Sequence, residues 1–155
     1  MKKRNGSVVI VTLFTCIILS AICLGCIEMV KTNSSIFFAK EKSLKLKYDA
    51  KSGLNLALSK VLEDVKNKEE NKLNIQDILE TDKARFINDI ESISDKDLKV
   101  KIINNDIYLE NQFIRFDISS QKEDGDFKKR VMCSVKINLN ENEIKRVHVY
   151  NYKEI

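Results

Sequence analysis

The fold is decided by an uncharged stretch near the N-terminus, residues 7–27, which read SVVIVTLFTCIILSAICLGCI. No charged residue occurs between Arg4 and Glu28. At about 1.5 Å per residue, a helix of this length covers roughly 30 Å, which is the thickness of the hydrocarbon core of a bilayer. In lipid, backbone groups find hydrogen-bond partners only within a helix or a closed barrel, so helix forms even where β-branched residues are frequent. The sequence therefore predicts a transmembrane helix over residues 7–30.

Two other interpretations of this stretch stay open. A cleaved secretory signal has a shorter apolar region and a small-x-small cleavage site, which Ser20-Ala21-Ile22 matches poorly. A lipoprotein signal would attach lipid to Cys26, although the residue three before it, Cys23, is not the branched aliphatic residue expected there. A retained helix fits best. Because long following domains translocate largely regardless of their charge, we expect a single-pass protein of the cell membrane with its N-terminus in the cytoplasm.

The rest of the chain is polar and charged. The 155 residues include 27 Lys and Arg against 23 Asp and Glu, and nearly all of them follow the apolar stretch. This length suits one small domain with an appendage and excludes a large multidomain enzyme. We divide the chain into a basic leader (1–6), the transmembrane helix (7–30), an amphipathic extension of that helix (31–66) and an extracytoplasmic head (67–155).

The extension carries a stripe of apolar or small residues at helical spacing. Between Lys31 and Val65 there is no Pro, and the stripe repeats every three or four residues. Its middle is small, so another helix or a sheet of the same domain could approach closely there. Four residues form this predicted packing face: Ala50, Gly53, Leu54 and Ala57.

The head begins with helical spacing and then changes to strand spacing. Residues 67–74 read as a polar connector and residues 75–93 as a second helix. After Ser94, apolar residues alternate with polar ones, which predicts strands near 98–103, 107–109, 114–118, 131–139 and 144–152. Short strands joined by tight turns indicate an antiparallel sheet with one polar face. We therefore expect an α+β fold in which a long N-terminal helix, transmembrane in its first half and amphipathic in its second, packs on a small antiparallel sheet.

None of the chemically suggestive residues forms a convincing site. Cys23 and Cys26 have C-x-x-C spacing but no second pair, and His148 lies alone in a strand. Asp124-Gly125-Asp126 lacks the ligand spacing of a calcium loop and reads as a turn. Lys128-Lys129-Arg130 is a short basic run, typical of a solvated face, and we do not expect a nucleic-acid partner. We therefore expect no enzyme activity, no cofactor and no metal.

The N-terminal third of the chain resembles a known family. Lys2-Lys3-Arg4-Asn5-Gly6, followed by Ser7 and the apolar stretch, is similar to the class III leader of type IV pilins and pseudopilins. The segment YDAKSGLNLA at residues 48–57 resembles the Ala-Ala-Glu-Ser-Gly-Leu-x-x-Ala block of PilX-type minor pilins. The pilin fold, a long N-terminal helix packed on an antiparallel sheet, agrees with the fold expected from the residues alone.

This resemblance implies processing and assembly. A prepilin peptidase would cut between Gly6 and Ser7, and Ser7 would then be N-methylated. The implied partners are other pilin subunits, the membrane-embedded assembly machinery and the membrane itself, with the protein in an extracellular pilus after assembly. Major pilins have Glu at the fifth position after the cut, where this chain has Val11. That departure argues against a major subunit and is compatible with PilX-like proteins and the K-type pseudopilin, which are thought to lie at the tip.

Two functions are therefore expected from the sequence. The first is a structural minor pilin or pseudopilin-like subunit of a type IV pilus or related filament, assembled through its hydrophobic helix. The second is a membrane-tethered extracytoplasmic binding or sensor domain, or a lipoprotein, that does not polymerise.

Overall fold

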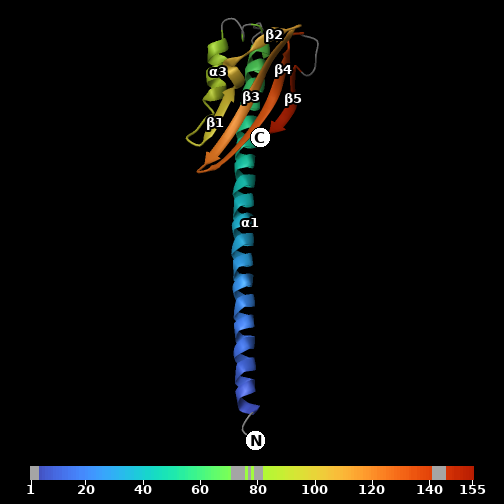
Figure 1. The fold of residues 1–155 in the computed structure, drawn as a ribbon. Helices are drawn as coiled ribbons and strands as arrows, with labels where there is room; N and C mark the ends of the chain where they lie inside the picture. Colours follow the sequence, from blue (N-terminus) through green and yellow to red (C-terminus); the bar gives the residue numbers. More distant parts are fainter. Residues whose placement is uncertain (1–3, 71–75, 77, 79–81, 141–145) are drawn as a thin grey trace. The chain divides into compact units, whose positions relative to one another are not determined.

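The computed structural model describes residues 4–70, 76, 78, 82–140 and 146–155. The chain divides into two compact units, residues 1–41 and residues 42–155, and the helix α1 (Arg4–Glu70) belongs to both. Besides the end of α1, unit 2 contains the helix α3, a short 3-10 turn η1 and five strands (Figure 1). Their bounds are α3 Lys83–Glu91, β1 Leu98–Ile102, η1 Ile103–Asn105, β2 Tyr108–Glu110, β3 Phe113–Asp124, β4 Phe127–Asn138 and β5 Val147–Glu154.

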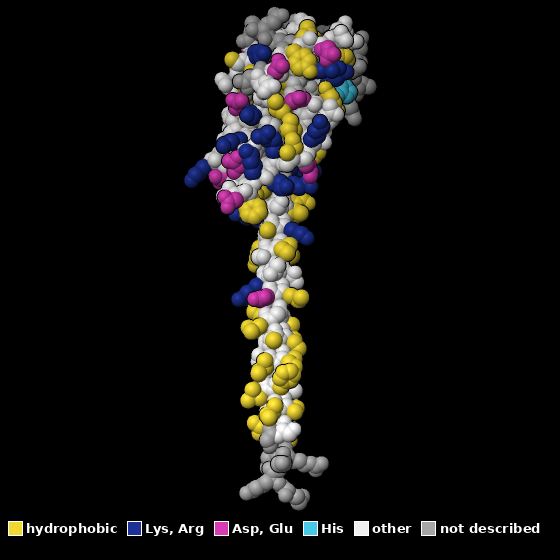
Figure 2. All heavy atoms as spheres, viewed as in Figure 1, with side chains coloured by type: hydrophobic (Ala, Val, Ile, Leu, Met, Phe, Trp, Pro, Cys, Tyr) yellow, Lys and Arg dark blue, Asp and Glu magenta, His cyan; other side chains and the backbone are white. Residues whose placement is uncertain are grey.

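The described part of unit 1 is helical, and its side chains from Ser7 to Phe38 are exposed. Hydrophobic side chains surround this part of α1 on the face shown in Figure 2. Several of its hydroxyls bond to the helix itself: Thr12 Oγ1 donates to the Val8 carbonyl at 2.9 Å, and Ser20 Oγ donates to the Cys16 carbonyl at 2.8 Å. Such bonds allow a hydroxyl to lie in an apolar setting. By length and composition alone, this helix could cross a membrane.

Unit 2 is built on one antiparallel sheet with the strand order β1-β3-β4-β5, in which β2 also pairs with β3. The central pair is a long hairpin in which Asp124 lies opposite Phe127 and Phe113 lies opposite Asn138. Its loop is the two residues Gly125 and Asp126, and Gly125 has a φ of +61°, which glycine adopts without strain.

One face of the sheet packs against α1 and α3 to form the core. The predicted stripe on α1 is buried from Leu46 onward, whereas Ile36 is exposed. In α3, Phe86 and Ile90 complete the core, and the ring of Phe86 meets that of Phe116 edge-on at 5.5 Å. The α+β architecture expected from the sequence is confirmed. The stripe residues that are buried are Leu46, Ala50, Leu54, Ala57, Val61 and Val65.

Gly53 makes a close contact in this core. A Cβ placed on Gly53 would be 2.6 Å from Ser120 Oγ of β3 and 3.0 Å from both methyl carbons of Leu98 in β1. A contact of 2.6 Å is too short for a real Cβ and one of 3.0 Å is unusually tight, so a side chain at residue 53 would force Ser120 and Leu98 to move. The Ser120 hydroxyl is buried there and has no hydrogen-bond partner among the residues that the structure describes.

Several predicted boundaries were wrong, for identifiable reasons. The connector expected at residues 67–74 is helical through Glu70, because Glu69 and Lys68 form ion pairs of 2.7 Å with Arg146 and Asp82, which lie much later in the sequence. The predicted second helix ends earlier than expected, at Glu91, and α3 begins at Lys83, directly after the non-helical Asp82. Its expected start at residue 75, the leader residues 2 and 3, and the expected start of the last strand at residue 144 lie outside the described residues.

The hairpin strands are longer than predicted. β3 and β4 continue past their apolar residues to a turn. Near this turn Glu123 forms ion pairs with Lys128 at 3.3 Å and with Lys99 at 3.6 Å. Oppositely charged cross-strand neighbours stabilise a pair of strands without any apolar alternation. The last strand ends later than expected, at Glu154, which forms an ion pair of 2.7 Å with Lys47 of α1.

We predict that Gly53→Leu destabilises unit 2 by about 1–3 kcal/mol or more, because the new side chain must push α1 away from the sheet. The neighbouring Ser52 is exposed, so Ser52→Leu should change the free energy of unfolding by less than about 0.5 kcal/mol. Thermal unfolding of both variants, followed by circular dichroism, measures the difference. Equal unfolding temperatures for the two variants would contradict the close contact.

Candidate functional site

The residues implicated in leader processing lie at the beginning of α1. The helix begins at Arg4, so the backbones of Gly6 and Ser7 are within it, and the Ser7 side chain is exposed. Four residues further along, Val11 is 58% exposed. The structure therefore places the predicted cleavage point in the exposed, apolar part of unit 1.

The four predicted packing residues are brought together, and their partner is the sheet of the same chain. Ala50, Leu54 and Ala57 have relative exposures of 0%, 1% and 0%, and they share one core cluster with residues of β1, β3 and β4. Gly53 is buried beside them. While unit 2 is folded, this face of α1 is therefore not available to a neighbouring subunit.

The cysteines fall into two environments. Cys16, Cys23 and Cys26 are exposed on α1 in unit 1, whereas Cys133 is buried in β4. Burial raises the pKa of the Cys133 thiol to about 11, so it stays protonated and unreactive at neutral pH. Across the described residues, no group of three or more His, Cys, Asp or Glu side chains could hold a metal ion.

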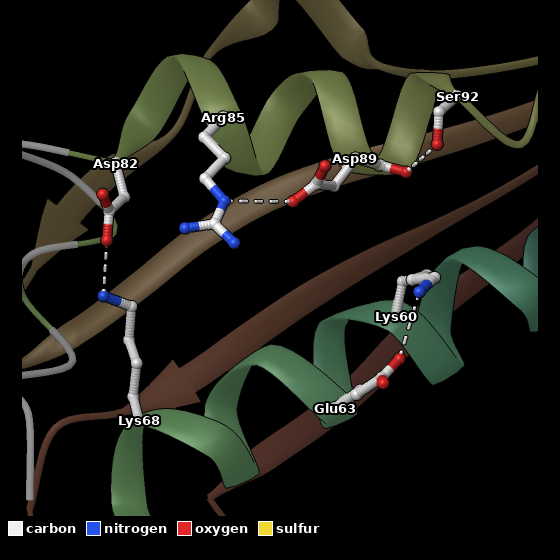
Figure 3. A network of polar contacts seen from close by, with 7 residues as sticks. All are labelled: Lys60, Glu63, Lys68, Asp82, Arg85, Asp89 and Ser92. Atoms are coloured by element: carbon white, nitrogen blue, oxygen red, sulfur yellow. Dashed lines mark hydrogen bonds and ion pairs between the residues drawn. The ribbon is translucent and has the colours of Figure 1, made fainter. Parts of the chain in front are cut away.

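Sequence reasoning missed a cleft of about 320 Å³ between the end of α1 and α3. Ion pairs flank it on both helices (Figure 3). Lys68 Nζ lies 2.7 Å from Asp82 Oδ2 and joins the two elements, while Arg85 Nε lies 3.8 Å from Asp89 Oδ2 within α3. The residues that line the cleft are Asp64, Asn67, Lys68, Ile78, Asp82, Arg85, Phe86 and Asp89.

The carboxyls of this cleft differ in their electrostatic setting. Burial raises the pKa of the Asp64 carboxyl, and the charges of Asp89 and Glu63 raise it further, while Lys60 and Arg85 partly offset the rise. The ionised form of Asp64 is therefore disfavoured in the folded protein. A signal for this cluster was present in the sequence, since Asp64 and Lys68 are one helical turn apart, but its partners come from a different helix.

The pair formed by Lys68 and Asp82 has the opposite character. A hydrogen bond from Lys68 lowers the pKa of the Asp82 carboxyl, and the Lys68 side chain is only 13% exposed. Ion pairing that holds α3 against α1 is the chemistry this arrangement supports directly. The cleft thus has a structural role in the fold.

Comparisons of this chain with protein-family models, with curated proteins and with solved structures found no match. The similarity to minor pilins accordingly stays a resemblance based on residues 2–57.

We predict that Asp64→Asn and Asp82→Asn change stability in opposite directions at neutral pH. Asp64→Asn should stabilise the fold, because it removes a charge that burial disfavours. The gain should be less than about 1 kcal/mol, because the carboxyl is partly exposed. The gain should shrink as the pH falls through the raised pKa, where Asp64 itself becomes neutral.

Asp82→Asn should destabilise the fold at neutral pH, because it leaves the Lys68 ammonium without its carboxylate. That loss should also diminish as the pH falls through the lowered pKa of Asp82, where the native pair is lost as well. Unfolding temperatures of both variants over an acid-to-neutral pH series test the signs. A destabilising Asp64→Asn at neutral pH would show that the charge of Asp64 is favourable.

Proposed function

We propose that this chain is a structural minor pilin or pseudopilin-like subunit of a type IV pilus or related filament, assembled through its hydrophobic N-terminal helix. The leader-like residues before Ser7 and the block at residues 48–57 support the family assignment. The α+β fold of unit 2, with the amphipathic part of α1 packed on an antiparallel sheet, is compatible with it.

The observation that carries the proposal is the apolar surface of unit 1. Large hydrophobic side chains such as Ile10, Phe14 and Leu24 are 70%, 64% and 64% exposed. Leaving such surface in water costs about 25 cal/mol for each Å². A bilayer would cover this apolar surface before assembly, and equivalent helices of other subunits would cover it within a filament.

The part of α1 available for assembly is its beginning. The packing face around Gly53 is occupied by the sheet of the same chain, so a neighbouring subunit cannot use that face, whereas the residues before Leu46 have mostly exposed side chains. In the proposed filament, the apolar residues of unit 1 contact neighbouring subunits, and the surface of unit 2 faces outward.

The mature N-terminus decides between the proposal and its rivals. Intact-mass and N-terminal mass spectrometry of protein from cells with an active prepilin peptidase should find a chain that begins at methylated Ser7. Protein from cells without the peptidase is the matched control and should keep Met1 or Lys2 with the leader.

Two other outcomes would assign this chain to a different class of protein. A retained leader in peptidase-positive cells would indicate a simple membrane-tethered domain, and a lipidated Cys26 would indicate a lipoprotein. Either result would overturn the pilin proposal.

We also propose that the subunit lies at the filament tip, because Val11 replaces the Glu with which a major pilin meets the N-terminal amine of its neighbour. Immunogold labelling of isolated filaments with an antibody against unit 2 should give label at filament ends. Label distributed along the whole shaft would contradict tip placement.

A further inference from the structure

The sheet of unit 2 has a second face, and no described element covers it. This outer face consists of the strand residues that alternate with the core positions, and Lys and Arg outnumber Asp and Glu on it. Figure 2 shows Lys and Arg side chains over unit 2, with hydrophobic side chains and some Asp and Glu side chains among them. Six basic or aromatic residues of this face are Lys101, Tyr108, Arg115, Lys136, Tyr150 and Lys153.

Strand register places these residues in neighbouring rows across the sheet. In one row Arg115 of β3 lies opposite both Tyr108 of β2 and Lys136 of β4. In the row two residues away along β3 and β4, Ser134 of β4 lies between Asp117 of β3 and Tyr150 of β5. The next row runs from Lys101 at one edge of the sheet, through Ser119 and Met132, to Lys153 at the other edge. Tyr108 therefore lies in the row of Arg115 and Lys136, Tyr150 lies in the next row with Ser134 and Asp117, and Lys101 and Lys153 are at the two ends of the row after that.

The basic groups are poorly compensated by the protein itself. Lys101 and Lys153 form no ion pair with any residue that the structure describes, and Lys136 Nζ lies 3.4 Å from the ring centroid of Phe113 instead of beside a carboxylate. Arg115 bonds to Glu110 at 2.6 Å through one terminal nitrogen, while its Nε is buried without a partner. Like charges directly opposite each other, as at Arg115 and Lys136, destabilise a sheet. Besides Glu110, Asp117 of β3 is a carboxylate within these rows, in the row of Ser134 and Tyr150. A face that keeps such repulsion is suited to an anionic partner.

The aromatic side chains restrict the kind of anion. Tyr108 and Tyr150 are 47% and 38% exposed on the same face as the lysines. Rings interleaved with Lys and Arg on an open surface offer stacking to bases and charge to phosphates. A duplex hides the faces of its bases, and a polyphosphate has none, so neither could use the rings.

We propose that the outer face of the unit 2 sheet binds single-stranded nucleic acid, with Tyr108 and Tyr150 stacking on bases and Lys101, Lys136 and Lys153 neutralising phosphates. The basic run visible in the sequence is a different feature: Lys128 pairs with Glu123, and Arg130 donates to Gln121 Oε1 at 3.0 and 2.6 Å. The proposal concerns unit 2 alone and is independent of filament assembly.

The test uses the full chain in nanodiscs of zwitterionic lipid and a short fluorescent oligothymidylate, followed by fluorescence anisotropy at several salt concentrations. Tyr150→Ala should weaken binding by about tenfold, and so should Tyr150→Leu, which retains an apolar side chain without a ring. Lys136→Ala and Lys101→Ala should each lower the slope of log affinity against log salt by about 0.7.

Matched controls come from α1, where Tyr48 is 60% exposed and Lys45 is also exposed. Tyr48→Ala and Lys45→Ala should leave both affinity and salt slope unchanged, and the unfolding temperature of each variant reports whether its fold is intact.

No binding of the oligothymidylate by the wild-type chain would overturn the proposal. Equal affinity for duplex DNA or polyphosphate of the same charge would overturn it too, as would unchanged affinity in both folded Tyr150 variants. Each result can be read whether or not the leader is cleaved, so failure here is distinct from failure of the pilin proposal.

Discussion

The fold of unit 2 depends on how closely α1 approaches the sheet at Gly53. Ser120 and Leu98 fill the space where a side chain would begin, and Ala50 and Ala57 continue the small surface one turn to either side. This contact fixes which face of α1 is buried and which face of the sheet is left open. The buried Ser120 hydroxyl, which has no hydrogen-bond partner among the described residues, shows that close packing is maintained there at some cost in polar satisfaction.

Local patterns predicted most of this architecture. The stripe from Leu46 to Val65 and the strand alternation were readable because each element buries one face. The end of α1 could not be predicted from the local sequence, because Glu69 forms an ion pair with Arg146, which lies far along the chain. The outer face was missed because it depends on register. Placing the hairpin loop at Gly125 and Asp126 aligns Arg115 with Lys136, and a shift of one residue would have sent one of them to the opposite face.

The two ends of α1 meet different requirements with one regular helix. Its beginning exposes apolar side chains that only lipid or other proteins can cover, and its end is committed to the core of its own domain. The proposed filament role uses the first property, and the proposed nucleic-acid surface uses the sheet face that the second leaves open. The cleft between α1 and α3 belongs to neither, since its ion pairs serve to fasten the helices together.

The burial of Cys133 makes the chain a reporter of its own folding. Its thiol is shielded by the core and held in the protonated form, whereas the nucleophile in alkylation is the thiolate. Because the remaining three cysteines all lie in unit 1, proteolytic separation of the apolar segment would leave a fragment with a single thiol. Its rate of alkylation would then follow the opening of the sheet, without any engineered label.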